Sequence, residues 1–161
     1  MNNVSASLAI LTALSLVGCG GGGGGTSTTT PTTPTTPTTK LAAKADLLGL
    51  WDSTRIINGQ ADVSYLLFTE DQIYAYDYMN DPYDVQNKTS LFSGQDCYVQ
   101  DGPYPVLYNA DSTISIYDKI NGWINSPPIT ITGLRADLGG MLGTGSINKS
   151  NLSATSFKLC F

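Results

Sequence analysis

Residues 20–39 contain only glycine, threonine, serine and proline, and they limit where this chain can fold. Six consecutive glycines occupy 20–25, and TSTTTPTTPTTPTT follows at 26–39. Neither segment has side chains that could bury enough area to offset the entropy of ordering a chain. The glycines predict a flexible joint, and the proline-rich part predicts an extended spacer of about 43 Å. We therefore expect the folded domain to follow this spacer.

An uncharged run, VSASLAILTALSLV, precedes the glycines at residues 4–17. As a helix it would span about 21 Å, which is too short for a hydrocarbon core of about 30 Å. Its length is typical of the apolar region of a secretory signal. A short buried helix is the alternative, and the glycine run directly after it argues against that alternative.

The end of this run, Leu16-Val17-Gly18-Cys19, resembles the lipobox of bacterial lipoproteins. The resemblance implies lipid attachment to the Cys19 thiol, cleavage after Gly18 and acylation of the new amino terminus. Gly20 after the cysteine implies sorting to the outer membrane. The expected partner is therefore a membrane of the bacterial cell envelope, contacted through the lipid on Cys19.

Three segments follow from this interpretation: a signal peptide at 1–18, a lipidated tether at 19–43 and a single domain at 44–161. A domain of about 115 residues can bury about two-thirds of its unfolded surface. The chain has 13 acidic and 8 basic residues. Because the basic residues are scattered, no cluster predicts binding to nucleic acid.

If Cys19 carries lipid, Cys97 and Cys160 are the two cysteines that remain. An oxidising compartment favours a disulfide between them. Closing this loop of about 60 residues would raise the free energy of unfolding by on the order of 4 kcal/mol, because the cross-link lowers the entropy of the unfolded chain. The alternatives are that the two cysteines are buried thiols or that they bind a metal ion as a pair. The chain has no histidine and no CxxC motif, which argues against a zinc site.

The rest of the domain predicts an all-β fold. Short segments rich in β-branched and aromatic residues alternate with turn signals such as Asn58-Gly59, Glu70-Asp71 and Asn121-Gly122. Strands are expected at 62–69, 72–78, 112–118, 128–134 and 154–161, and one short helix at 41–48. We expect an antiparallel meander of about 8 strands that closes into a small barrel, with a small β-sandwich as the alternative.

Gly49-Leu50-Trp51 resembles the GxW motif that opens the first strand of lipocalin-like barrels. In that family the glycine lets the chain turn into the barrel and the tryptophan closes its base, which implies structural roles for Gly49 and Trp51. The family's TDY triplet is missing. The domain is also short for a roomy ligand cavity, so an interior filled by its own side chains is the alternative.

The absence of histidine removes the usual general base, the Ser-His-Asp and Cys-His systems and most catalytic metal sites. Paired carboxylates are left, but no motif associates such a pair with a pocket. We expect a protein that is not an enzyme and that needs no cofactor.

One segment, DYMNDPYD at 77–84, gathers oxygen-bearing side chains: Asp77, Asn80, Asp81 and Asp84. Hard cations such as Ca²⁺ prefer these ligands. The segment lacks the spacing and the glycine of an EF-hand, and Asn-Asp-Pro is also typical of an ordinary turn. A solvated hairpin loop is the first interpretation, and a calcium site is the second.

Aromatic residues raise a similar choice. Tyr74, Tyr76 and Tyr78 share one face of a predicted strand, and with Trp123 they are the candidate ligand-binding residues. Tyrosines also fill small barrels with their hydroxyls at the rim. Two functions remain open: an envelope lipoprotein that binds an apolar or aromatic small molecule, or a structural lipoprotein that docks on another envelope protein.

Overall fold

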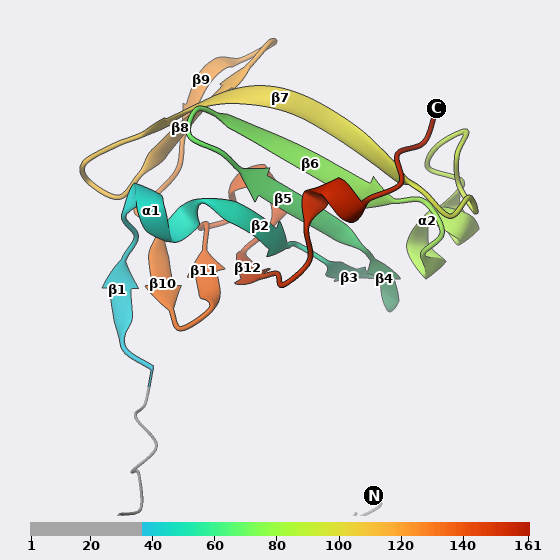
Figure 1. Ribbon diagram of the computed structural model, residues 1–161, viewed down its shortest axis with the longest axis horizontal. Coiled ribbons are helices and arrows are strands. Elements are labelled where there is room, and N and C mark those ends of the chain that lie inside the picture. Colours follow the sequence, from blue (N-terminus) through green and yellow to red (C-terminus); the bar gives the residue numbers. More distant parts are fainter. Residues whose placement is uncertain (1–36) are drawn as a thin grey trace, which may run out of the picture. The chain divides into compact units, whose positions relative to one another are not determined.

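A computed structural model describes residues 37–161, which form twelve strands and a few short helices (Figure 1). In chain order the elements are β1 (Thr39–Leu41), α1 (Lys44–Leu47), β2 (Gly49–Asp52), β3 (Arg55–Ile57), β4 (Gln60–Asp62), β5 (Ser64–Phe68), β6 (Gln72–Tyr78), α2 (Pro82–Asn87), β7 (Tyr98–Tyr108), β8 (Ile114–Asp118), β9 (Gly122–Asn125), β10 (Thr130–Thr132), β11 (Arg135–Asp137), η1 (Met141–Gly143), β12 (Ser146–Lys149) and η2 (Ala154–Ser156).

Ten strands form one hydrogen-bonded sheet in the order β1-β10-β11-β12-β2-β5-β6-β7-β8-β9, and every pair in it is antiparallel. β3 and β4 form a separate hairpin. The prediction of an all-β, antiparallel fold is confirmed. The sheet has ten strands, two more than the sequence suggested.

The sheet is not closed into a barrel, contrary to the first expectation, because its outermost strands β1 and β9 do not pair with each other. The segment between β9 and β10 passes through this gap. There the Ile129 amide donates to the Ser112 carbonyl at 2.8 Å, and the Ala42 amide donates to the Ile129 carbonyl at 2.9 Å. Single hydrogen bonds of a connecting segment therefore take the place of a closing ladder.

Within residues 37–161 the hydrophobic core lies on the inner face of the curved sheet. It draws side chains from β2, β5, β6, β7, β8, β10, β11 and β12, so the two halves of the sheet curve around the same core. Its fully buried large members are Trp51, Phe68, Ile73, Ile114, Ile129, Leu138 and Ile147. Burial of this apolar surface is the main stabilising contribution to the fold.

The Gly49-Trp51 segment starts β2 at the edge of this core. Gly49 has a φ of +109°, a conformation that favours glycine. The indole of Trp51 is 1% exposed and donates to the Leu47 carbonyl at 2.6 Å. Lys149 of β12 lies over the ring, with its Nζ 4.5 Å from the centroid. The structure therefore places Gly49 at a turn into the sheet and Trp51 in the core.

The folded part begins earlier than residue 44. Thr39–Leu41 forms β1, which pairs along its whole length with β10, and Ala42 belongs to the core. These residues were expected to be tether, because threonine after a Thr/Pro repeat has no local feature that distinguishes a strand from a spacer. The predicted helix at 41–48 is reduced to α1, Lys44–Leu47.

The carboxy-terminal segment 154–161 differs from the predicted strand. It contains η2 and then an extended tail that contacts the sheet through one parallel bridge, Tyr98 to Leu159. A disulfide joins Cys97 to Cys160, with Cα atoms 5.2 Å apart. Phe157 of this segment packs on the rings of Tyr65, Tyr76 and Tyr98, so the tail covers part of the outer face of the sheet. The cysteine pairing predicted from the sequence is present.

Within residues 37–161 no helix has the length and apolar character that crossing a membrane requires.

Candidate functional site

Strands β5 and β6 present two different faces because side chains alternate along a strand. On the inner face the paired residues change from polar to apolar along the strands: Ser64 opposite Asp77, Leu66 opposite Ala75, and Phe68 opposite Ile73. Phe68 and Ile73 are 1% exposed in the core, whereas the polar end is only partly covered. This inner face is the floor of the candidate site.

Two adjoining hollows lie on that floor, and together we call them the trough. The apolar hollow has a volume of about 540 Å³ and the polar hollow about 400 Å³. They share Leu66, Ala75, Asp101 and Leu142 in their linings. The apolar hollow is lined chiefly by Leu66, Tyr104, Ile116, Ile124, Met141 and Leu142. The polar hollow adds Ser53, Arg55, Ser64, Asp77 and Thr144.

The segment that borders the trough opposite the floor has an unusual backbone. Gly139, Gly140, Leu142 and Gly143 all have φ between +58° and +85°. For leucine this left-handed conformation costs on the order of 1 kcal/mol. The strained Leu142 borders both hollows, so the backbone strain coincides with the wall of the trough.

Two polar groups at the polar end of the trough have hydrogen-bonding capacity left. Thr144 is buried, and its Oγ1 finds no hydrogen-bond partner within the described residues. Arg55 donates from Nη1 to the Gly143 carbonyl at 3.1 Å, and its side chain is 43% exposed. A polar group of a bound molecule could therefore be recognised at this end.

An acidic cluster adjoins the polar hollow. It consists of Asp62, Asp77, Asp81 and Asp84, and one carboxylate oxygen from each lies within 4.8 Å of the others. Asp62, Asp81 and Asp84 are between 1% and 3% exposed. Asp77 belongs to both features, since it also lines the polar hollow.

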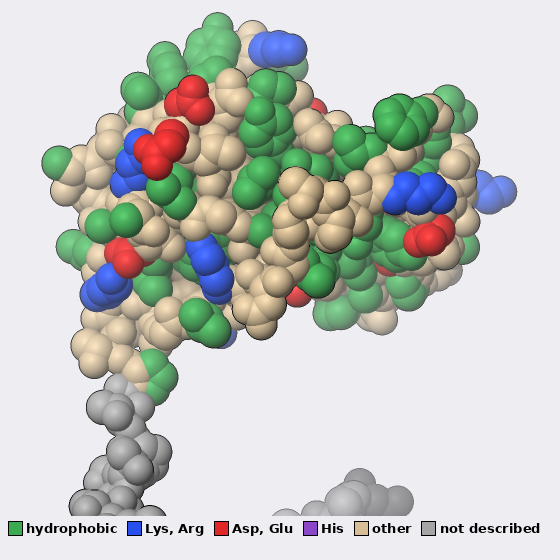
Figure 2. Space-filling view, viewed as in Figure 1, with side chains coloured by type: hydrophobic (Ala, Val, Ile, Leu, Met, Phe, Trp, Pro, Cys, Tyr) green, Lys and Arg blue, Asp and Glu red, His purple; other side chains and the backbone are tan. Residues whose placement is uncertain are grey.

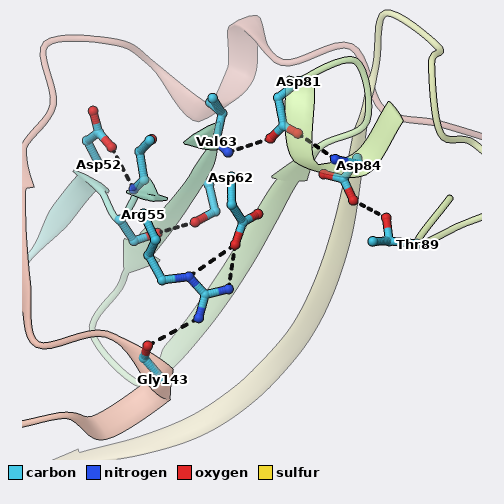
Figure 3. A network of polar contacts seen from close by, with 11 residues as sticks. Asp52, Arg55, Asp62, Val63, Asp81, Asp84, Thr89 and Gly143 are labelled. Atoms are coloured by element: carbon cyan, nitrogen blue, oxygen red, sulfur yellow. Dashed lines mark hydrogen bonds and ion pairs between the residues drawn. The ribbon is translucent and has the colours of Figure 1, made fainter. Parts of the chain in front are cut away.

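Local hydrogen bonds hold the cluster in place (Figure 3). Asp81 caps α2 by accepting from the Asp84 amide at 2.8 Å, and its other oxygen accepts from the Val63 amide at 2.5 Å. Asp-Pro at a helix start is a common signal, because aspartate caps the helix and Pro82 fits its first turn. Arg55 binds Asp62 Oδ2 through Nη2 at 2.6 Å and Nε at 3.1 Å.

Burial and mutual repulsion shift the acidity of the cluster. The pKa of Asp77 is raised to about 7, chiefly by burial and then by the charges of Asp84, Asp62 and Asp81, while Arg55 opposes the shift. Burial also raises the pKa of Asp84, although a hydrogen bond from Thr89 opposes the shift. Buried Oδ1 of Asp77 and Oδ2 of Asp84 find no hydrogen-bond partner among the described residues.

The structure brings together only part of the calcium site considered from the sequence. Asp77, Asp81 and Asp84 meet, but Asn80 is exposed and does not belong to the cluster. Asp62 was missed. The turn at Glu70-Asp71 contained a usable signal: it sets a register that pairs Ser64 with Asp77 and so brings Asp62 near the end of β6.

The candidate aromatic ligand residues are not gathered in the trough. Tyr76 borders the polar hollow but is 6% exposed, and its ring packs on Phe157 at 5.2 Å between centroids. Tyr74 and Tyr78 line neither hollow. Trp123 lies on the β8–β9 hairpin, 49% exposed, against Tyr117. Cys19, the predicted lipid attachment site, lies outside the described residues.

Comparisons with protein-family models, with curated proteins and with solved structures return no match to this chain.

Proposed function

We propose that this protein is a membrane-tethered envelope lipoprotein whose β domain binds an apolar or aromatic small molecule in the trough. The observation that carries the proposal is the apolar hollow of about 540 Å³ beside the core. A volume of this size is within the range of small-molecule sites, about 300–1,000 Å³. Its apolar lining would gain free energy by excluding water in favour of an apolar ligand.

The charge around the trough narrows the ligand class. Asp101 lines both hollows, Asp118 lines the apolar one and Asp77 lines the polar one. Among the residues that the structure describes, Arg55 is the only basic one in either lining. An anionic head group would be repelled by this balance of charge, so we propose a neutral or cationic amphiphile whose polar part meets Ser53, Ser64 and Thr144.

The proposed tether rests on the lipobox Leu16-Val17-Gly18-Cys19 and on the glycine and Thr/Pro segments after it. Export with the lipid on Cys19 would hold the β domain at the outer membrane. Replacing Cys19 with serine should release the protein from the membrane fraction. A Cys19→Ser variant that still sediments with membranes would contradict the tether.

Ligand binding is tested with a neutral apolar dye, N-phenyl-1-naphthylamine, whose fluorescence rises in apolar surroundings. Saturable binding by the full chain is expected, and Ile124→Asp should weaken it at least tenfold because Ile124 lines the apolar hollow and is 42% exposed. Ile56→Asp is the matched control, since Ile56 is 69% exposed and lines neither hollow. Equal loss in both variants, or no saturable binding, would contradict the proposal.

A second candidate function, docking on another envelope protein, is favoured by the β8–β9 hairpin. Figure 2 shows hydrophobic side chains gathered over this hairpin at the top of the view. Its exposed apolar residues on the face away from the trough and at the turn, together with one from β7, are Leu107, Tyr117, Ile120 and Trp123, between 40% and 90% exposed. Exposed apolar patches of this kind often mark protein contacts.

The docking function predicts that Ile120→Asp abolishes a specific crosslink to an envelope protein in cells while dye binding is retained. Ile120 suits this test because it is 90% exposed and lines neither hollow of the trough. If the crosslink pattern is unchanged in Ile120→Asp, the docking candidate loses its support.

A further inference from the structure

We propose that Asp62, Asp77, Asp81 and Asp84 form a Ca²⁺ site that joins the β3–β4 hairpin, the end of β6 and the start of α2. This inference is independent of ligand binding in the trough. It differs from the site considered from the sequence by including Asp62, which lies 15 residues before Asp77, and by excluding Asn80.

The geometry matches the size of the ion. Ca²⁺ takes oxygen ligands at about 2.3–2.6 Å, so two ligand oxygens on opposite sides of one ion are about 4.8 Å apart. In the cluster one oxygen from each of the four carboxylates lies within 4.8 Å of the other three. Four carboxylates from three segments can therefore surround a single Ca²⁺ ion with little rearrangement.

The charge of the ionised cluster favours binding of a cation. Arg55 is the only basic residue that forms an ion pair with the cluster in the described part of the chain, and it binds Asp62 Oδ2 from one side. With all four carboxylates ionised, one guanidinium leaves an excess of three negative charges in a largely buried space. Such repulsion is relieved either by protons or by a bound cation.

The second and independent observation is the buried oxygen of Asp84. The residue is 1% exposed, and Oδ2 finds no partner among the described residues, although Oδ1 accepts a hydrogen bond from Thr89. Figure 3 shows one oxygen of Asp84 directed at Thr89 and the other directed toward Asp81. A buried carboxylate oxygen without a donor is costly, and a coordinated ion would satisfy it.

Asp77 supplies a second buried oxygen, Oδ1, without a partner in the described residues. The two oxygens of Asp81 are already oriented by the amides of Val63 and Asp84. Such outer contacts orient metal-ligating carboxylates in known sites. The cluster therefore contains one carboxylate oriented by backbone amides, that of Asp81, and two carboxylates, those of Asp77 and Asp84, that each have an oxygen without a partner among the described residues.

The experiment is a calorimetric titration of the purified full chain with CaCl₂ at pH 7.5, after treatment with a chelator and its removal. We expect one Ca²⁺ per chain with a Kd of about 10⁻⁶–10⁻⁴ M, a higher melting temperature with Ca²⁺, and weaker binding of Mg²⁺. Absence of binding up to 5 mM CaCl₂ by the wild-type chain would overturn the proposal. This outcome does not depend on any variant folding.

Two variants locate the site. Asp84→Asn and Asp77→Asn keep the shape of the side chain and should each weaken Ca²⁺ binding at least tenfold. Asn80→Ala is the matched control from the same segment, and its affinity should equal that of the wild type. Wild-type affinity in both cluster variants, or loss of binding in Asn80→Ala alone, would overturn the assignment.

A third variant separates an ion site from a cluster that has only a structural role. Arg55→Gln removes the cation that competes for Asp62, so Ca²⁺ should bind at least threefold more tightly. It also keeps a hydrogen-bond donor near Asp62. Weaker Ca²⁺ binding in a folded Arg55→Gln chain would contradict the proposed role of the four carboxylates as the ligands.

Discussion

The two faces of strands β5 and β6 differ in how far other parts of the chain cover them. On the outer face the rings of Tyr65, Tyr76 and Tyr98 pack on Phe157, with centroids 5.1, 5.2 and 4.3 Å away. The disulfide from Cys97 to Cys160 anchors the carboxy-terminal tail, which contains Phe157, next to the start of β7. On the inner face the same strands border the trough and the acidic cluster, where buried oxygens have no partner in the described residues.

This difference supports the inner face as the binding surface that we propose. Of the aromatic residues that suggested a ligand surface in the sequence, Tyr76 packs on Phe157 of the carboxy-terminal tail, and Tyr78 packs on Tyr98, which also contacts Phe157. The groups whose interactions are incomplete lie on the inner face, in Asp77, Asp84 and Thr144. Because unpaired buried polar groups are costly, they are better indicators of binding than aromatic content alone.

The largest expected effect on stability comes from removing the disulfide that anchors the carboxy-terminal tail to the outer face. Replacing both Cys97 and Cys160 with alanine removes a crosslink between residues 63 apart in sequence. The free energy of unfolding should fall by about 4 kcal/mol because the unfolded chain gains entropy. Urea denaturation measures the loss. Reduction of the wild-type protein should give a similar value, and an unchanged midpoint would show that the tail is held by packing alone.

Phe157→Ala removes aromatic packing from the same outer face and leaves the disulfide intact. Loss of a half-buried ring that contacts three tyrosines should lower the free energy of unfolding by about 2 kcal/mol. Phe161→Ala is the matched control, because Phe161 is fully exposed. Equal denaturation midpoints for the two variants would mean that the aromatic packing contributes little.

The acidic cluster on the inner face should make stability depend on pH in the presence of a chelator. The pKa of Asp77 is about 7 in the folded chain, against an ordinary value of 3.8, so between these values only the folded chain keeps the proton. The free energy of unfolding should therefore be highest near pH 4 and fall toward pH 7, by about 2 kcal/mol after allowance for the partial exposure of Asp77.

Thermal denaturation between pH 4 and pH 7.5 measures this slope. The charges that act on Asp77 are those of Asp84, Asp62, Asp81 and Arg55. Asp77→Asn should flatten the profile, whereas Asp111→Asn, in an exposed turn, should leave it unchanged. A profile in Asp77→Asn as steep as that of the wild type would assign the slope to other groups.

The smallest effect on stability is expected at Leu142. Leu142→Gly relieves a leucine at φ +58° but removes apolar contacts, so the free energy of unfolding should change by less than about 1 kcal/mol. Affinity for N-phenyl-1-naphthylamine should fall about fivefold, because the side chain borders both hollows. Leu152→Gly, outside the trough and 51% exposed, is the control for dye binding.

Local signals in the sequence were sufficient for several elements. The alternation in QIYAYDY predicted residues 72–78, which are the bounds of β6. Asn58-Gly59 and Asn121-Gly122 lie at the turns of the β3–β4 and β8–β9 hairpins. These features are short-range: side-chain alternation and turn geometry depend on residues that are adjacent in the chain. Cys97 and Cys160 could be paired by counting once Cys19 was assigned to lipid.

Other features depended on contacts between distant segments. The three-residue strand β1 is a strand because β10 pairs with it, and the segment at 154–161 is a covering tail because Phe157 packs on tyrosines of three other strands. The helix α2 was missed although Asp81-Pro82 is a helix-start signal, because Asn-Asp-Pro is equally typical of a turn.

The sequence by itself determined the all-β class, the β6 strand and an acidic segment, and it favoured the cysteine pairing, since alternation, turn residues and cysteine number are properties of the chain alone. Only the tertiary structure decided that the sheet stays open, that Tyr76 is covered by Phe157 and that Asp62 joins Asp77, Asp81 and Asp84. The physical reason is that sheet closure, burial and carboxylate clustering depend on which distant residues meet, and local propensity carries no information on that.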